Sequence, residues 1–412
     1  MLSSSFFRMS ASRRTTCNIY YDPNVKEVLA KLRKLKRNDR DLNHDVDDRR
    51  HHQKQRDILQ QSGSDTAATL TLIGYKGGTL ESQINQDRAV VISPFLVGKD
   101  QRTQATKKRR SLDTSETDQT NSRFVAVFDG HARLGEKVSQ YSVTELPNLL
   151  ASKLEEMEAT GEESEMVKEA LIDAFIEIDR TCPGEISGGC TASVVLQRGS
   201  KVYVANAGDS RSFLVVYRPS KKTVEIVYIS REDKPHLPDE MKRVEECGGQ
   251  VYLPPMGTSR VLYTDPDSGM QSGLAMSRSI GDWEVGKLGV IPDPIVEVID
   301  VEAVVQTQVL RDCQIPPEDE TMDTSCFVSS DDVHVFAVSA TDGLMDFASP
   351  EVIAQAVASS LYHDDAPYLL SALEQLIYFA ASGWEKAKQG RYRDDIAVSV
   401  TTIREPPKAP PQ

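Results

Sequence analysis

Four aspartates stand next to short apolar segments that lie far apart in the chain. They are Asp129 after Phe124–Phe128, Asp209 after Val202–Ala205, Asp342 after Val333–Val338, and Asp394 before Ile396–Val400. The apolar segments are typical of buried β-strands. A carboxylate at a strand end costs free energy if it is buried alone, and a bound cation offsets that cost. Several carboxylates at one sheet edge suit a hard metal ion such as Mg²⁺ or Mn²⁺. The sequence therefore predicts a metal site.

The composition excludes several other kinds of protein. The 412 residues are 39% hydrophobic and 27% charged, which is typical of a soluble globular chain with one large domain or two ordinary ones. A formal net charge of −14 argues against broad nucleic-acid binding, which needs Lys and Arg against phosphates. No apolar run approaches the roughly 20 residues of a transmembrane helix. The six cysteines form no CxxC pair, and none is followed six positions later by Arg. This favours a reducing compartment and excludes the usual loop of cysteine-nucleophile phosphatases.

Three regions differ in composition: an N-terminal extension (1–66), a globular region (67–403) and a proline-rich tail (404–412). Residues 1–21 lack Asp and Glu, which fits an organellar transit peptide and equally a flexible basic N-terminus. Residues 25–35 predict a short basic amphipathic helix, and residues 38–66 are polar enough to be disordered. The cluster Lys107–Arg110 indicates either a nuclear import signal or a solvated loop.

The globular region alternates groups of strands with groups of helices. Strands are predicted at 67–75, 88–97, 191–196, 202–205, 212–217 and 224–229, and helices at 135–155, 165–179, 238–247, 350–361 and 368–389. Pro147 is expected to kink or break the first of these helices. Closely spaced strands indicate antiparallel sheets with helices outside them, and the βαβαβ rhythm of a doubly wound fold is missing. The fold class is therefore α+β.

Eight segments, in order, resemble the motifs of the metal-dependent protein serine/threonine phosphatases, the type 2C or PPM family. They are Asn85–Asp87, Phe124–His131, Gly188–Ala192, Ala205–Arg211, Asp233–Pro235 with Glu245–Gly249, Leu274–Asp282, Ala340–Asp346 and Arg393–Val398. The similarity covers residues ~70–403, and we interpret residues 67–403 as a PPM-type phosphatase domain. It implies a four-layer α-β-β-α sandwich in which two antiparallel sheets are flanked by antiparallel helix pairs.

The resemblance also implies a site for two Mg²⁺ or Mn²⁺ ions and, in some members, a third. Asp129 matches the aspartate that bridges both metals, the Gly130 carbonyl matches a second ligand, Asp342 and Asp394 match carboxylates on the first metal, Asp87 matches the residue that orders metal-bound water, and Asp209 and Asp346 match ligands of the third ion. His131 matches the histidine that protonates the leaving oxygen. For Asp282 a structural hydrogen-bonding role and a metal-binding role both stay open.

Two positions depart from the common family pattern. Many members carry a glutamate where Gln86 stands, and an arginine that grips the substrate phosphate where Ser82 stands. The Gln86 side chain still offers a neutral oxygen to a metal or its water, so weaker binding is expected rather than loss. Lys76 is a candidate for the missing phosphate contact. The same Asn-Gln-Asp motif occurs in plant-like members that resemble active enzymes.

The predicted function is hydrolysis of phosphoserine and phosphothreonine in phosphoprotein substrates. A water held between two divalent cations loses a proton near neutral pH and becomes a nucleophile, and an imidazole can protonate the departing alkoxide. The alternative is a catalytically weak or inactive relative that binds phosphoproteins as a scaffold. We expect a monomer in the cytoplasm or nucleus, with organellar targeting by residues 1–21 as the other possibility. Residues 234–261 resemble the family's flap, and the acidic insertion 312–332 is predicted to be a mobile loop.

Overall fold

The computed structural model describes residues 66–78, 82–96, 122–157, 164–183, 188–265, 268–312, 330–362 and 368–404, together with three short strands before residue 20. The predictions for the helix at 25–35, the disordered segment up to residue 65, the Lys107–Arg110 cluster, the central part of the acidic insertion and the C-terminal tail lie outside these residues.

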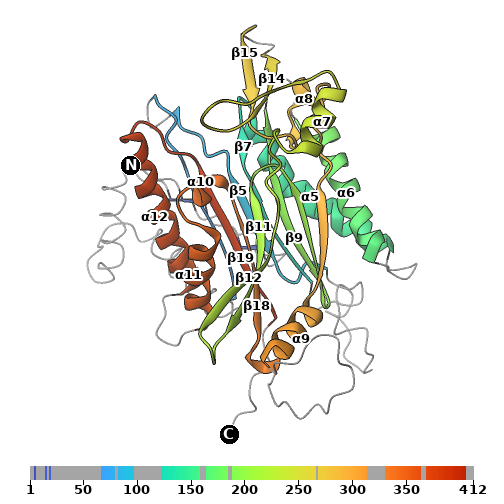
Figure 1. Ribbon diagram of the computed structural model, residues 1–412, viewed down its shortest axis with the longest axis vertical. Coiled ribbons are helices and arrows are strands. Elements are labelled where there is room, and N and C mark those ends of the chain that lie inside the picture. Colours follow the sequence, from blue (N-terminus) through green and yellow to red (C-terminus); the bar gives the residue numbers. More distant parts are fainter. Residues whose placement is uncertain are drawn as a thin grey trace, which may run out of the picture.

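Two large sheets form the centre of the molecule (Figure 1). The first has the order β1 (Ser4–Ser5), β3 (Asn18–Ile19), β4 (Ala67–Leu72), β19 (Ile396–Arg404), β18 (His334–Ala340), β11 (Arg211–Arg218), β12 (Thr223–Ile229). The second has the order β17 (Ile295–Asp300), β10 (Lys201–Ala207), β9 (Ala192–Arg198), β6 (Arg123–Phe128), β5 (Arg88–Ile92), β2 (Arg14–Thr15). Neighbouring strands are antiparallel except for β3 and β4, which confirms the predicted antiparallel sheets. The strands β1–β3 belong to a segment for which the sequence analysis predicted no strands.

A pair of long helices covers the outer face of each sheet, as Figure 1 shows. Helices α5 (Gly135–Met157) and α6 (Ser164–Thr181) pack on the second sheet, and α11 (Pro350–Tyr362) and α12 (Leu369–Lys388) pack on the first. Pro147, where we expected a kink or a break, lies inside α5 and does not end it. Its side chain is buried, so packing offsets the lost backbone hydrogen bond. The α+β class is confirmed, and the arrangement is consistent with the expected four layers.

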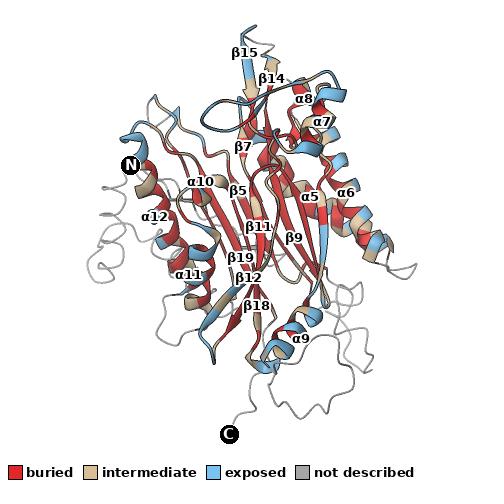
Figure 2. Ribbon diagram, viewed as in Figure 1, coloured by how far each residue is buried: buried red, intermediate tan, exposed pale blue. Residues whose placement is uncertain are grey.

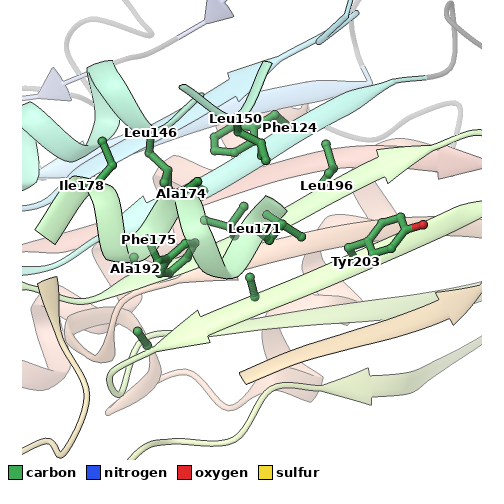
Figure 3. Packing of buried hydrophobic residues seen from close by; sticks show 14 of the residues in the cluster. Phe124, Leu146, Leu150, Leu171, Ala174, Phe175, Ile178, Ala192, Leu196 and Tyr203 are labelled. Atoms are coloured by element: carbon green, nitrogen blue, oxygen red, sulfur yellow. The ribbon is translucent and has the colours of Figure 1, made fainter. Parts of the chain in front are cut away.

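Three apolar clusters separate these layers, and burial follows them (Figure 2). The cluster beneath α5 and α6 includes Leu150, Leu171 and Phe175, which pack against Phe124 and Leu196 of the second sheet (Figure 3). Burying each such side chain stabilises the fold by about 1.5–3 kcal/mol. The two helices therefore support the second sheet from its outer face.

Hydroxyl groups also line the interface between the two sheets. Ser212 Oγ lies 2.7 Å from Ser193 Oγ on the second sheet and 2.7 Å from Ser339 Oγ on its own sheet. Thr69 Oγ1 and Ser399 Oγ are 2.9 Å apart, and Ser399 donates to the Ala126 carbonyl of the other sheet. These directional contacts fix the register of one sheet against the other, which apolar packing alone does weakly.

Smaller elements lie at one end of the sandwich. Strands β7 (Gly130–His131), β8 (Gly189–Cys190) and β16 (Ile280–Gly281) form one small sheet, and β13 (Gln250–Tyr252), β14 (Arg260–Thr264) and β15 (Gln271–Leu274) form another. The other helices at this end, among the described residues, are α7 (Pro238–Glu246), α8 (Trp283–Gly286) and α10 (Asp342–Met345). Helix α9 (Val301–Asp312) lies at the opposite end of the sandwich (Figure 1), in contact with the 3₁₀ turn η2 (Ser330–Asp332). Within the described ranges no helix has the length and apolarity needed to cross a membrane.

Candidate metal centre

The aspartates singled out in the sequence meet at one end of the two sheets because of strand register. Asp87 and Asp129 flank the paired residues Arg88 and Phe128 at the ends of β5 and β6. On the other sheet, β18 ends just before Asp342 and pairs with the start of β19, just after Asp394. The four carboxylates, with Asp209 after β10, are called the acidic cluster below.

Thr341 joins the two sheets at the acidic cluster. Its hydroxyl donates to Asp87 Oδ2 at 2.8 Å and accepts a hydrogen bond from the Ala397 backbone N at 2.9 Å. The Thr341 N–H in turn donates to the Ala397 carbonyl. Since both Thr341 and Asp87 are fully buried, these bonds fix the Asp87 carboxylate relative to the strand that follows Asp394.

Hydrogen bonds of their backbone groups fix the positions of Asp129 and Gly130. The Asp129 N–H donates to Thr191 Oγ1 at 3.0 Å, and the Thr191 N–H donates to the Asp129 carbonyl at 2.9 Å. The Gly130 N–H donates to the Gln86 carbonyl at 3.2 Å. A Cβ on Gly130 would lie 2.6 Å from that same oxygen and 2.5 Å from the Gly135 carbonyl. Only glycine therefore fits at this position.

Carboxylate oxygens in the acidic cluster lack partners. Asp87 Oδ1, Asp209 Oδ1 and Asp342 Oδ1 are buried and accept no hydrogen bond from any described residue. Burial, followed by the charges of neighbouring aspartates, raises the pKa values of Asp87 and Asp129 well above their usual range. For Asp342, burial and then the charges of Asp209 and Asp394 raise the pKa to about 8. The carboxylates are thus crowded enough to repel one another.

Two lysine side chains form ion pairs with carboxylates at this site. Lys76 Nζ lies 3.1 Å from Asp394 Oδ1 and 3.2 Å from Asp395 Oδ2, and Lys234 Nζ lies 2.6 Å from Asp209 Oδ2. Burial alone would lower the pKa of each ammonium, but the adjacent carboxylates more than offset this and raise it. Both lysines are therefore held as cations and neutralise part of the acidic cluster.

Whether a divalent cation suits this site depends on the oxygen atoms that the acidic cluster offers as ligands. Among the described residues no three Asp, Glu, His or Cys side chains already stand in a ligating arrangement. The unpartnered oxygens of Asp87, Asp209 and Asp342 are nevertheless hard donors whose mutual repulsion a cation would relieve. The chemistry of these donors therefore suits Mg²⁺ or Mn²⁺.

The two departures from the family pattern lie beside Lys76. Gln86 donates through Nε2 to the Ala132 carbonyl at 2.8 Å, while its Oε1 accepts from Lys76 Nζ at 3.4 Å. Ser82 is exposed, and its hydroxyl accepts from Gln83 Nε2 at 3.3 Å. Lys76 is therefore the cationic side chain that contacts both Gln86 and the acidic cluster.

His131 is paired with an aspartate from another part of the chain. Its Nε2 lies 2.6 Å from Asp282 Oδ2. Burial alone would lower the pKa of the imidazole, but the Asp282 carboxylate more than offsets this and raises it above its usual value. This geometry favours the structural hydrogen-bonding role for Asp282 over direct metal binding.

The segment that resembles the flap is clamped at its base. The buried Glu240 carboxylate of α7 accepts hydrogen bonds from Arg231 Nη2 at 2.7 Å, Arg278 Nη2 at 2.7 Å and Ser277 Oγ at 2.6 Å. Arg278 Nε adds a fourth at 2.9 Å, and Arg243 of the same helix adds a fifth. These bonds hold the Glu240 pKa at about 2, despite the opposing effect of burial. The β13–β15 hairpin therefore extends from a fixed platform.

Comparison with known protein sequences identifies the family. A sequence model described as "Protein phosphatase 2C" matches residues 98–382 of this chain. The chain belongs to the protein phosphatase 2C family. It is therefore a protein serine/threonine phosphatase by family. It is 27% identical to "Probable protein phosphatase 2C 48" of Oryza sativa subsp. japonica over 85% of this chain and 87% of the relative. It is 26% identical to "Probable protein phosphatase 2C 72" of Arabidopsis thaliana over 68% of this chain and 76% of the relative.

Solved structures agree on the fold. A serine-threonine phosphatase 2C from Toxoplasma gondii superimposes with a TM-score of 0.54 at 18% identity, over 82% of this chain and 94% of that one. A Caenorhabditis elegans sex determining protein superimposes with a TM-score of 0.51 at 19% identity, over 94% of this chain and 77% of that one. At these identities the likeness establishes the protein phosphatase 2C fold alone.

Against this family background, the predicted site residues fall into two groups. Asp87, Asp129, Asp342 and Asp394 lie together with Asp209, Gly130, His131 and Lys76 at one end of the sheets. Asp346 follows α10 as its C-cap residue and is exposed, and the charges of Asp394 and Asp209 reach its carboxylate.

Sequence reasoning missed several residues that hold the site. Asp395 accepts from the Gly74 N–H at 2.6 Å and from the Gln86 N–H at 3.2 Å, and so joins the two loops that carry Lys76 and Asp87. Its place in the Asp-Asp pair before β19 was a signal that could have found it. The contacts of Lys234 and Thr341 carry no such signal, because their partners are far away in sequence.

Proposed function

We propose that this chain is a metal-dependent phosphatase that hydrolyses phosphoserine and phosphothreonine in proteins by direct attack of water, with two Mg²⁺ or Mn²⁺ ions at the acidic cluster. The observation that carries the proposal is the set of buried, unpartnered oxygens on Asp87, Asp209 and Asp342. A buried polar atom without a partner is costly, and a cation is the group that satisfies several carboxylates at once.

Each residue has a proposed place around the ions. Asp129 would bridge them, the Gly130 carbonyl would be a ligand of one, Asp342 and Asp394 would hold the other, Asp87 would orient a water, and Asp209 with Asp346 would serve a third, weaker site. When bound, the ions supply positive charge that activates water and stabilises the transferring phosphoryl group. The neutral Gln86 in place of an acid predicts weaker binding at one of the positions.

Lys76 and His131 would act on the substrate. In the metal-free chain Lys76 Nζ contacts Asp394 and Asp395. Once cations neutralise them, the ammonium is free to bind a phosphate oxygen, a role that the exposed Ser82 cannot fill. His131 would protonate the leaving oxygen of serine or threonine, which departs poorly as an alkoxide.

A second function is favoured by the same two lysines. Lys76 and Lys234 already neutralise Asp394 and Asp209, which lowers the need for metal at those carboxylates. A relative that retains the fold with a weakened metal site would bind phosphoproteins as a scaffold without hydrolysing them. Gln86 is consistent with this alternative.

Turnover of p-nitrophenyl phosphate distinguishes the two functions. The purified chain is assayed with Mn²⁺, with Mg²⁺ and with EDTA, beside an Asp342→Asn variant whose folding is checked by circular dichroism. The proposal predicts hydrolysis that needs the metal and is lost in Asp342→Asn. Turnover no greater than that of the variant would leave only the binding function.

A further inference from the structure

The contact between His131 and Asp282 depends on the small sheet formed by β7, β8 and β16. His131 and Gly281 both pair with Gly189, one on each side of β8. This register brings Asp282, the residue after Gly281, to the imidazole, where Oδ2 lies 2.6 Å from Nε2. A Cβ on Gly189 would lie 2.3 Å from Asp282 Oδ2. Glycine at this position therefore makes room for the pair.

Asp282 is held in place from several directions. It is 2% exposed, its Oδ2 accepts a second hydrogen bond from Ser279 Oγ at 2.6 Å, and its N–H donates to the Gly188 carbonyl. Its backbone adopts φ 51° and ψ 38°, a left-handed conformation that costs a non-glycine residue about 1–2 kcal/mol. Such strain persists where surrounding contacts enforce it, often at functional sites.

A further clamp joins this loop to α6. Asp179 Oδ1 accepts from the Gly281 N–H at 2.7 Å, and the Asp179 carbonyl accepts from Trp283 Nε1 at 3.2 Å. The residues on both sides of Asp282 are thus tied to a long helix that packs on the second sheet. The Asp282 carboxylate is positioned independently of the acidic cluster.

The other nitrogen of the His131 ring is left for a ligand. Nδ1 is buried and has no hydrogen-bond partner among the residues that the structure describes. Asp209 and Lys76 lie near enough to influence the ring electrostatically, so the imidazole borders the acidic cluster. Because Nε2 is occupied by Asp282, Nδ1 is the ring nitrogen left for another partner.

We infer that Asp282 is a positioning residue for His131: it accepts the Nε2 hydrogen and fixes the ring so that Nδ1 serves the leaving oxygen of the substrate. The inference rests on the proposed phosphatase function. In that step the phosphorus bond to the serine oxygen breaks, its electron pair stays on that oxygen, and the Nδ1 proton moves to it. The water oxygen forms the new P–O bond, and both water protons leave with the phosphate product. The Nε2 hydrogen stays with the ring throughout.

Leaving-group dependence separates this role from support of the loop alone. A serine alkoxide needs a proton to depart, whereas p-nitrophenolate is stable without one. A well-placed general acid contributes roughly 10²–10⁴-fold. With Mn²⁺, Asp282→Asn should therefore lower kcat for a phosphoserine peptide about 10- to 100-fold and lower kcat for p-nitrophenyl phosphate less than about threefold.

Two further variants complete the experiment. Ser279→Ala keeps the Asp282 carboxylate but removes one of its hydrogen bonds, so we expect a smaller loss of kcat that is limited to the phosphopeptide. This variant also tests the inference if the Asp282→Asn chain does not fold. Asp179→Asn loosens the loop and should affect both substrates alike. In a His131→Ala background, Asp282→Asn should cause no additional loss.

The outcomes are distinct. Equal losses on both substrates in Asp282→Asn and Ser279→Ala, or a further loss in the His131→Ala background, would reduce Asp282 to a loop support and overturn the inference. If the wild-type chain hydrolyses p-nitrophenyl phosphate with Mn²⁺, the proposed function stands in either case. A wild-type chain that hydrolyses neither substrate would overturn the proposed function and this inference with it.

Discussion

Replacing Asp342 with asparagine should stabilise the metal-free protein at mildly alkaline pH. The carboxyl group is buried beside Asp209 and Asp394, and these surroundings raise its pKa from 3.8 to about 8. Ionisation of Asp342 in the folded chain is therefore unfavourable unless a cation is bound. Asparagine has nearly the same shape and stays neutral at every pH.

The sign and size follow from proton linkage. Because the folded pKa lies above the unfolded one, the folded chain binds more protons between these values. The free energy of unfolding therefore falls as pH rises from about 4 to about 8 and levels off above that. A shift of roughly four units corresponds to an upper limit of about 6 kcal/mol at about 1.4 kcal/mol per unit. Since Asp342 shares its repulsion with neighbouring carboxylates, we expect about 1 kcal/mol per pH unit, or about 2 kcal/mol between pH 6 and 8.

Urea unfolding in EDTA measures this slope. Wild type, Asp342→Asn and Asp173→Asn are compared at pH 6, 7 and 8; Asp173 is a matched control on α6 whose side chain is 67% exposed. Wild type and the control should lose stability with rising pH, and Asp342→Asn should lose less. Added Mn²⁺ should restore the stability of wild type at pH 8 and have little effect on Asp342→Asn. Identical slopes for wild type and Asp342→Asn would refute the reasoning.

Three other substitutions test separate parts of the site. Thr341→Val removes two buried hydrogen bonds and should lower the free energy of unfolding by about 2–4 kcal/mol in urea titrations; a loss below about 0.5 kcal/mol would contradict the bridging role. Lys234→Met frees Asp209 and should add a weak Mn²⁺ site in calorimetric titrations, whereas Lys234→Arg should not; equal stoichiometry in both would refute competition between lysine and metal. Gly343→Ala places a Cβ 1.9 Å from a backbone oxygen and should cost more than about 3 kcal/mol, whereas Gly286→Ala meets nothing within 4 Å and should be near neutral; similar melting temperatures would contradict the packing.

Much of the fold could be predicted because local signals agree with tertiary packing. The apolar face of α6 and the alternation of short strands with tight turns predicted elements within a few residues of their observed bounds. Helix α9 was missed because its apolar residues form only a weak stripe. Pro147 does not break α5, because packing of the helix on the sheet outweighs one lost backbone bond.

The site was predictable where a residue type has a chemical reason to follow a strand, as Asp129 and Asp342 do. The contacts between such residues were not predictable, because they depend on how the strands pair with one another. The pairing of His131 with Asp282 crosses 151 positions of sequence, and that of Thr341 with Asp87 crosses 254. No local pattern encodes either distance, so both needed the three-dimensional arrangement.

The Glu240 clamp has a consequence for how substrate choice could diverge among relatives. Since five hydrogen bonds to Glu240 secure the foot of this segment, residues 250–265 and 268–274 can carry exposed apolar side chains such as Leu253 and Met256. Exchange of this segment between relatives, with junctions in α7 and at Ser277, would therefore change the surface offered to a partner while the acidic cluster keeps its own contacts.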